Sequence, residues 1–256
     1  MRSKRFCVLP FILVVGLISA ASAQTDWKGF YIGANVGGNL SRTDATTTTV
    51  FSPTGYFAIT SVPAIAALSP QHPDSNGFVG GGQAGYNFQS GALVFGLEAD
   101  IGAMTGSDTR TSTGVYPCCA PTTFTVAQRM EHSWLFTARP RVGFTAGRAL
   151  FYVTGGLAVT NFNYRELFTD TFATANESAV IDETKAGWTA GGGLEYQVHQ
   201  HWSVKGEYLY ADFGDERVTS TNLTAFTPPI AFPVNVFTHR ADLRNHIFRF
   251  GVNYRF

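Results

Sequence analysis

The chain has 256 residues, equal numbers of acidic and basic side chains, and only 14% charged residues, against roughly 25% in ordinary soluble domains. Hydrophobic residues make up 45% of the sequence, and Gly (27), Phe (22) and Tyr (10) are abundant. No apolar run of about 18 residues follows the N-terminal region, which excludes membrane-spanning helices. The zero net charge and the lack of basic clusters argue against nucleic acid as a partner.

The N-terminal residues have the composition of a secretory leader. Basic residues at positions 2, 4 and 5 precede the apolar run Phe6–Ile18, and the small residues Ala21-Ser22-Ala23 follow it. This order is typical of a cleaved signal peptide, and the run is too short to favour the alternative of an N-terminal anchor. The sequence therefore predicts a signal peptide over residues 1–23 and one domain over residues 24–256.

The rest of the chain consists of segments in which apolar and polar side chains alternate, the pattern of strands with one buried face. Eight segments are predicted, the last of them ending the chain at Phe256; the first seven are Phe30–Leu40, Gly77–Phe88, Ala92–Thr105, His132–Phe144, Ala149–Tyr164, Lys185–Val198 and His201–Phe213. Pro140 predicts a local irregularity in the fourth, because proline cannot donate to the ladder.

Connections between these segments alternate in length. Short turns near residues 90, 147 and 200 alternate with four long polar stretches, which are residues 41–76, 106–130, 165–184 and 214–243. This asymmetry is typical of outer-membrane barrels, with short periplasmic turns and long extracellular loops. The sequence therefore predicts an all-β, eight-stranded antiparallel transmembrane β-barrel whose N- and C-termini are both periplasmic.

A count of ten strands is the alternative. Within the first long stretch, Thr46–Phe51 and Tyr56–Val62 flank the turn-forming sequence Ser52-Pro53-Thr54-Gly55. These segments predict a hairpin that projects above the barrel, and counting it would raise the number of strands to ten.

The ionisable side chains of the predicted strands gather on one face, together with many glycines. They are Glu98, Asp100, Arg139, Arg141, Glu195, Lys205, Glu207 and Arg249. The opposite face carries aromatic residues near strand ends, which suits lipid boundaries. We therefore expect the apolar face to point outward into lipid; a secreted soluble barrel with that face inward is the alternative.

A barrel of eight strands is only just wide enough for side chains to fill it. Buried charges must be paired, because an unpaired one costs several kcal/mol. We expect Arg139 and Arg141 to pair with Glu98, Glu195 and Glu207 in a plug that holds the barrel together. The alternative interpretation of this charge network is a narrow polar pore.

The last eight residues alternate Phe250, Val252, Tyr254 and Phe256 with polar residues and glycine. This octet resembles the terminal assembly signal of outer-membrane barrels, in which Arg249, Gly251, Tyr254 and Phe256 would be read by the barrel assembly machinery during insertion. The resemblance implies that machinery as a transient partner.

The whole mature chain resembles the small outer-membrane barrel family of opacity and OmpA-type proteins, especially the surface antigens of α-proteobacteria. The likeness is carried by Trp27–Gly33, Gly192–Tyr196, Trp202–Tyr210 and the terminal octet. It implies an integral protein of the bacterial outer membrane that stabilises the envelope, contacts lipid, and exposes loops to host or environmental molecules. Because nothing follows Phe256, we expect no periplasmic cell-wall-binding domain.

Catalytic, metal and cofactor sites are not predicted. His199 and His201 lie beside a turn with no acid or cysteine at a convincing spacing, and His132 and Ser133, being adjacent, face opposite ways. Cys118 and Cys119 are too close in sequence to form a usual chelating pair, and a loop disulfide between them is expected. His72, His239 and His246 are assigned to outer loops, where they could ligate haem.

The sequence therefore predicts a structural, non-enzymatic barrel that interacts with molecules at the cell surface, with no cofactor. A narrow porin-like channel or a haem-binding surface receptor is the alternative function.

Overall fold

The computed structural model describes residues 26–256, so the predicted signal peptide lies outside the described part of the chain. The elements are β1 (Gly29–Thr49), α1 (Ser61–Leu68), β2 (Asn76–Ser90), β3 (Leu93–Met104), β4 (Ser107–Val115), β5 (Thr123–Glu131), β6 (Trp134–Ala146), β7 (Ala149–Asp170), β8 (Asn176–Gln197), β9 (Trp202–Ser220), β10 (Thr224–Ala225), β11 (Ile230–Ala231) and β12 (Phe237–Arg255). Within residues 26–256, no helix is long and apolar enough to cross a membrane.

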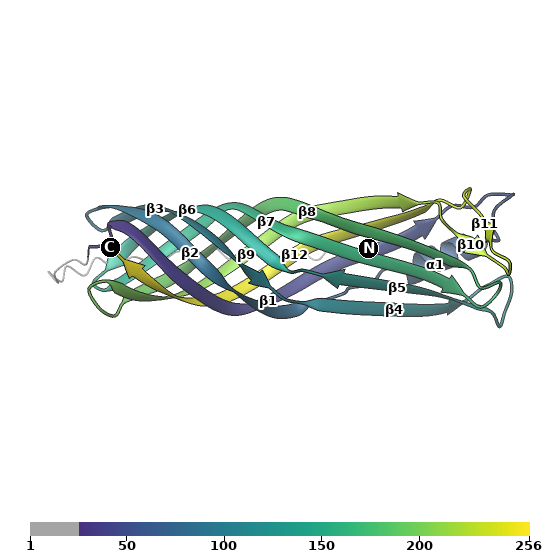
Figure 1. Ribbon diagram of the computed structural model, residues 1–256, viewed down its shortest axis with the longest axis horizontal. Coiled ribbons are helices and arrows are strands. Elements are labelled where there is room, and N and C mark those ends of the chain that lie inside the picture. The colour runs from purple at the N-terminus through teal and green to yellow at the C-terminus, as the bar shows by residue number, and fades with distance from the viewer. Residues whose placement is uncertain (1–25) are drawn as a thin grey trace, which may run out of the picture.

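Eight of these strands close into an antiparallel ring in the order β1, β2, β3, β6, β7, β8, β9, β12, with β12 returning to β1 (Figure 1). The closing pair runs from Tyr31 opposite Arg255 to Thr49 opposite Phe237. Closure leaves no unpaired edge within the ring, which is a requirement for backbone inside a membrane. The predicted eight-stranded antiparallel barrel is confirmed.

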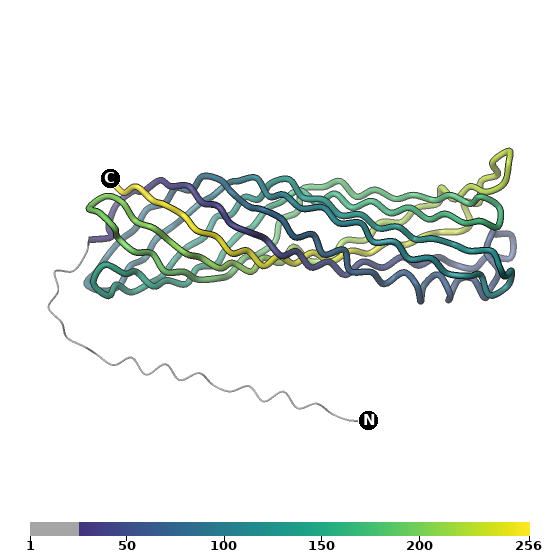
Figure 2. Tube along the Cα trace, turned by 90° about the horizontal axis from the view of Figure 1, so that it is seen from below, coloured from purple at the N-terminus to yellow at the C-terminus, as the bar shows by residue number. Residues whose placement is uncertain are grey.

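The barrel is a long cylinder with two different ends (Figures 1 and 2). The C-terminus, the start of β1 and the three short turns lie at one end, here called the turn end. The opposite end, here called the loop end, holds α1, β10, β11 and the tip of the β4–β5 hairpin. Both ends of the described chain therefore lie on the side of the short connections.

A belt of exposed apolar side chains surrounds the half of the barrel nearer the turn end. Its limits on the ring strands are Phe30 and Leu40, Phe78 and Phe88, Leu93 and Ile101, Val142 and Phe144, Phe151 and Leu157, Trp188 and Tyr196, Trp202 and Tyr208, and Phe248 and Phe256. Water would be a poor solvent for so much apolar surface, whereas a bilayer solvates it. Toward the loop end the outer face turns polar, at Arg42, Asp44 and Arg244. The alternative of a soluble barrel with its apolar face inward is therefore wrong.

The strands extend farther toward the loop end than the sequence predicted. β1 continues from the expected end at Leu40 to Thr49, and β12 already begins at Phe237. β7, β8 and β9 likewise extend into stretches that were expected to be loops. Polar composition was misleading here, because threonine-rich segments such as Thr46–Thr49 fit a pleated strand well. Much of the predicted loop sequence is barrel wall.

The hairpin predicted within residues 41–76 is wrong. Its first arm belongs to β1, and its second arm leads into the helix α1. Pro63 is compatible with this helix because it occupies the first turn, where backbone N–H groups have no partner inside the helix. A hairpin forms instead within residues 106–130, where β4 pairs with β5 and β5 pairs with the outer part of β7.

The segment after α1 completes the wall at the loop end. Strand β1 loses its partner β2 beyond the pair Leu40–Asn76. Ala45 and Gln71 then exchange two backbone hydrogen bonds of 3.0 Å, and Ile65 of α1 is fully buried. We call this junction between β1 and β4, closed by α1 and residues 69–75, the seam.

Elsewhere in the wall, the hydrogen-bonded ladder between β6 and β7 skips Arg139 and Pro140, which is the irregularity predicted for Pro140.

Candidate functional site: the filled lumen

The eight ionisable residues singled out from the sequence all face the lumen, at the level of the belt. Arg139 lies at the centre, 2.8 Å from Glu98, 2.8 Å from Asp100 and 3.2 Å from Glu207. Four acids and four bases balance, so the cluster is neutral as a whole. We call these residues the charge layer.

The remaining pairs connect all eight residues into one network. Arg141 reaches Glu195 at 3.1 Å and Glu98 at 3.5 Å. Arg249 donates to Asp100 at 2.8 Å and to Glu207 at 2.6 Å, and Lys205 donates to Glu98 at 2.8 Å. The partners expected for Arg139 and Arg141 are thus the ones found, with Asp100 added. Because these side chains are buried, the pairs do not act as exposed surface ion pairs.

Two tyrosines that were not predicted as site residues complete the charge layer. Tyr31 donates to Glu98 at 2.7 Å and Tyr152 donates to Glu207 at 3.0 Å. Each ring lies across a luminal glycine: a Cβ on Gly85 would stand 2.3 Å from the Tyr31 hydroxyl, and one on Gly193 would stand 2.6 Å from the Tyr152 hydroxyl. The glycines of this face therefore provide room for large polar side chains.

Trp27 closes the lumen at the turn end. Its indole is buried with Val94, Leu150 and Tyr152, and the Arg255 guanidinium lies 5.3 Å from the centre of its ring. Asn87 donates to the Trp27 carbonyl at 3.0 Å, which fixes the backbone across the opening. The residue lies just before β1, so it folds back under the barrel rather than continuing the wall.

Toward the loop end, the charge layer gives way to a layer of buried apolar side chains. Its members include Val79, Met104, Met130, Leu135, Phe162, Leu209, Leu243 and Ile247. His132, between β5 and β6 and beyond the belt, is buried beside this layer, with Nε2 3.4 Å from the Ser41 hydroxyl. Burial lowers the pKa of His132 to about 4, so its imidazole is neutral at physiological pH.

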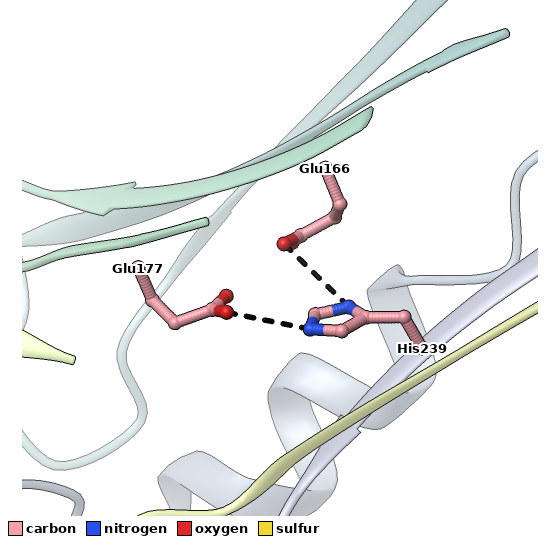
Figure 3. A group of neighbouring side chains, drawn as sticks. All are labelled: Glu166, Glu177 and His239. Carbon is pink, nitrogen blue, oxygen red and sulfur yellow. Dashed lines mark ion pairs between the residues drawn. The ribbon is translucent and has the colours of Figure 1, made fainter. Parts of the chain in front are cut away.

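A second polar group lies beyond this apolar layer, formed by residues from stretches whose composition predicted loops. Glu166 of β7, Glu177 of β8 and His239 of β12 are buried and meet in the lumen (Figure 3). Burial, together with the neighbouring Glu177 carboxylate, raises the pKa of Glu166 to about 10. His239 was expected in an outer loop, as a candidate haem ligand; it lies instead inside the barrel. We call these three residues the Glu–His cluster.

An apolar cap covers the Glu–His cluster at the loop end. Phe57, Phe124, Phe168 and Phe237 are buried together with Ile65 of α1. Above them, Tyr56 and Tyr116 donate to the same oxygen of Asp170, at 2.5 and 2.9 Å. Burial raises the pKa of both phenols, with the nearby Asp170 carboxylate as the second cause. Side chains thus fill the described lumen from one end to the other.

The predicted disulfide is present, and it lies beside the cap. Cys118 is bonded to Cys119 at the tip of the β4–β5 hairpin, and Cys119 packs against the apolar cluster. The Cys118 sulfur lies 3.7 Å from the Ser61 hydroxyl at the start of α1. The cysteine pair therefore contributes to the contact between the hairpin and the segment that closes the seam.

The other two candidate haem ligands lie outside the barrel, just beyond the belt. His72 and His246 line one polar cleft of about 560 Å³, together with Arg42, Tyr210 and Arg244. His72 is 2.8 Å from Asp44, and His246 is 2.8 Å from the Tyr208 hydroxyl. The sequence did not indicate that these two histidines are neighbours, because 173 positions separate them and only the closure of β12 on β1 joins them.

The terminal octet divides between the two faces of β12. Arg249 and Gly251 are buried on the luminal face, whereas Tyr254 is partly exposed and Phe256 is exposed on the outer face. Tyr254 packs edge-on against Trp202, and Phe256 lies 5.7 Å from Phe30, between ring centres. The octet thus forms part of the pairing between β12 and β1 that closes the ring, and its role as an assembly signal stays a prediction.

Neither His199 with His201 nor His132 with Ser133 forms a pair of nucleophile and base. His199 and His201 are exposed at the turn end, and His201 hydrogen-bonds to the Arg255 carbonyl at 2.8 Å. His132 faces inward while Ser133 is exposed, as expected for adjacent residues on opposite faces.

The luminal residues that were not predicted from the sequence fall into two groups with different causes. Tyr31 and Tyr152 occur at the polar positions of the predicted alternation, so the two-residue repeat of the strand could have placed them on the luminal face. Glu166, Glu177 and His239 lie in stretches that were assigned to loops, where no alternation was sought. Extending the strand period through those stretches would have placed all three on the luminal face.

Comparison with known proteins agrees with this architecture. The outer membrane protein beta-barrel domain family matches residues 9–256. The 31 kDa outer-membrane immunogenic protein of Brucella melitensis is 32% identical over 190 residues, which cover 71% of this chain and 68% of the relative. The 22 kDa outer membrane protein of Rhizobium leguminosarum is 31% identical over 137 residues, covering 54% of this chain and 53% of the relative.

Solved structures resemble the chain at lower identity. OprG from Pseudomonas aeruginosa covers 90% of this chain and 98% of its own, with 10% identity and a TM-score of 0.45. Neisserial surface protein A covers 89% of this chain and 97% of its own, with 14% identity and a TM-score of 0.38. The relationship is established by the domain match and by the sequence identity to the Brucella protein rather than by these structures.

Proposed function

The chain belongs to the outer membrane protein beta-barrel domain family, and we propose that it is a structural, non-enzymatic outer-membrane barrel that is closed to solutes and presents its loop end to the cell surface. The observation that carries this proposal is the filled lumen. Trp27, the charge layer, the apolar layer and the cap follow one another along the axis, and their side chains are buried.

A closed barrel of this kind is suited to mechanical stability rather than transport. Ions crossing it would have to break several mutually paired buried charges, each of which loses its partner at a cost of several kcal/mol. They would also have to pass the apolar layer, in which charged solutes are not solvated. The alternative of a narrow porin-like channel requires both barriers to open together.

Single-channel recording in planar bilayers tests the closed barrel. Refolded full-length mature protein should insert without producing discrete conductance steps, while a large general porin recorded in the same bilayers serves as the sensitivity control. Reproducible open steps from the refolded protein, absent with detergent alone, would favour the channel.

We propose further that the loop end faces outward and that both termini lie in the periplasm. The outer face beyond the belt carries charged side chains such as Arg42 and Arg244, and the strands extend well past the belt only in that direction. An epitope inserted near residue 229, between β10 and β11, should be detected on intact cells. The same epitope at Gly147, in a short turn, should be detected only after the outer membrane is permeabilised; the reverse pattern would overturn this orientation.

The loop end also offers the surface on which a host or environmental partner would be met. Apolar side chains stand exposed there without a lipid belt around them, among them Phe51, Phe172, Phe226 and Ile230. Exposed apolar groups at the tip of an extracellular wall are typical of contact surfaces. The chemistry of the partner is not specified by these residues.

Haem binding is the second candidate function, and the outer cleft is the observation that favours it. His72 and His246 could ligate iron, and Arg42 and Arg244 line the same cleft, where they could pair with carboxylates. Haem titration should then be weakened by replacing His72 or His246 with Ala and unaffected by His239→Ala, since His239 is inside the barrel. Equal titration of all variants would exclude this cleft as a haem site.

A further inference from the structure

The Glu–His cluster is an isolated polar compartment between two apolar regions. The His239 imidazole lies between the two carboxylates, with Nδ1 3.5 Å from Glu166 and Nε2 3.4 Å from Glu177 (Figure 3). One ligating atom from each of the three residues lies within 4.8 Å of the other two. The three residues come from β7, β8 and β12, so the cluster spans the loop-end lumen.

The cluster lacks a permanent positive charge. Within residues 26–256, the ion pairs of Glu166 and Glu177 involve only His239, in contrast to the charge layer, where each acid meets Arg or Lys. If both carboxylates were ionised, the cluster would hold two negative charges among buried side chains, with only the His239 imidazole beside them. A buried charge of this size requires a counter-ion or the uptake of protons.

Hydrogen bonding also leaves the cluster incomplete. Neither carboxylate oxygen of Glu166 has a hydrogen-bond partner among the described residues, and one oxygen of Glu177 has none. The Tyr164 hydroxyl on the same side of β7 is likewise buried without a hydrogen-bond partner. Buried polar atoms are nearly always satisfied in native proteins, so several unsatisfied oxygens around one point indicate a missing ligand.

We propose that Glu166, Glu177 and His239 bind one divalent transition-metal cation of the zinc class. A doubly charged cation neutralises two carboxylates, and it accepts the lone pairs that have no donor. One imidazole nitrogen with two carboxylate oxygens is a ligand set of intermediate softness, which suits Zn²⁺ better than the oxygen-preferring Ca²⁺.

The surroundings of His239 favour ligation through Nε2. Thr47, directly opposite on β1, places its hydroxyl 3.1 Å from Nδ1, so Nδ1–H can donate to it. Such a contact fixes the ring and leaves Nε2 as the ligand atom, the usual arrangement around metal-bound histidines. Gln128 of β5 donates to the same Thr47 hydroxyl at 3.3 Å, which adds a further support. Glu177 already lies on the Nε2 side, whereas Glu166 lies on the Nδ1 side and would have to change its rotamer to join the same ion.

A cation at this point would be structural. It would join β12 to the β7–β8 hairpin across the lumen. This position lies nearer the loop end than the charge layer, whose ion pairs do not connect the strands there. The cap covers it, so we expect loading during folding or through transient opening of the seam, and slow exchange afterwards.

Metal content after refolding tests the proposal. The metal-free protein is refolded in detergent with Zn²⁺, passed through a chelator-treated column, and its bound zinc is measured per chain. Wild type should retain one ion, and His239→Gln and Glu177→Gln should lower the affinity at least tenfold. His72→Gln, which alters an exposed histidine beside Asp44, is the matched control and should retain the ion. Refolding with Ca²⁺ in place of Zn²⁺ should leave no retained ion.

X-ray absorption of the zinc-loaded wild type keeps the test independent of how the variants fold. It should show nitrogen and oxygen ligands at about 2.0–2.1 Å, with a single imidazole. The proposal is overturned if wild type refolded with zinc retains none, if His239→Gln and Glu177→Gln retain it as tightly, if several imidazoles surround the ion, or if Ca²⁺ is held equally well.

Discussion

Arg139 shows how strongly single residues in this lumen depend on their partners. Its guanidinium contacts Glu98, Asp100 and Glu207, and it is fully buried. Arg139→Ala would leave these acids with one base fewer, and breaking a buried network in this way costs about 3–5 kcal/mol. We expect the variant to convert to the unfolded band at a clearly lower temperature when unboiled samples are run on a gel.

Arg110 is the matched control for Arg139. It forms an ion pair with Asp108 at 2.8 Å, but its side chain is half exposed on β4. Exposed pairs contribute about 0–1 kcal/mol, so Arg110→Ala should unfold at nearly the wild-type temperature. Equal effects of the two substitutions would mean that the charge layer does not stabilise the barrel.

His132 makes stability depend on pH. Its pKa is about 6.5 when unfolded and about 4 in the barrel, because burial disfavours the imidazolium. As the pH falls below 6.5, the imidazole of the unfolded chain takes up a proton before the buried one does, and this favours the unfolded state. The contribution of His132 to the free energy of unfolding is therefore complete above pH 6.5 and falls by roughly 3 kcal/mol at most as the pH approaches 4. Urea unfolding in detergent should therefore show a steeper loss between pH 6.5 and 4 for wild type than for His132→Gln. Parallel pH profiles would show that His132 is accessible to water.

The sequence revealed the charge layer because its residues lie within strands of clear alternation. Arg139 and Arg141 stand at polar positions between Phe136, Val142 and Phe144, so the face and even the partners could be inferred. Glu166 and His239 could not be found in the same way. Their neighbours Arg165 and Arg240 also carry charge, so polarity on both faces concealed the strand.

At the level of elements, the number of ring strands was predictable and their length was not. Lipid solvates the outer face near the turn end, and this requires the apolar alternation that the sequence displays. Beyond the belt, water solvates the outer face, and β1 and β12 remain strands without any apolar outer positions. The polar stretches therefore resemble loops in composition, although luminal packing at Ala45 and Ala241 keeps them in the wall.

The helix α1 provides a test of the seam. Ile65 is fully buried in the cap, whereas Ile59, just before the helix, has 66% of its surface exposed. Ile65→Asp buries an unpaired charge and should detach α1, so that a protease added to the folded protein cleaves within residues 50–75. Ile59→Asp should leave this segment resistant. The belt half of the barrel should stay folded in both variants, as a heat-shift gel can show; equal resistance of the two variants would mean that α1 does not close the seam.

For the whole molecule, the central claim is that lipid contacts the belt while side chains close the lumen. This claim has two consequences. Water must be excluded from the outer face near the turn end, and lipid must not reach the interior of the barrel. The four tryptophans of the chain sample both sides, which makes them internal probes. Trp188 and Trp202 stand outward with 52% and 47% of their surface exposed, whereas Trp27 is 1% exposed within the lumen.

Fluorescence quenching by brominated lipids, measured on single-tryptophan variants refolded into vesicles, is the most direct test. Variants that retain only Trp188 or only Trp202 should be quenched strongly by the lipid bromines and weakly by aqueous acrylamide. The variant that retains only Trp27 should be protected from both quenchers. If acrylamide quenched Trp188 and Trp202 while the brominated lipids did not, the belt would face water, and the account of this protein as a lipid-embedded closed barrel would be contradicted.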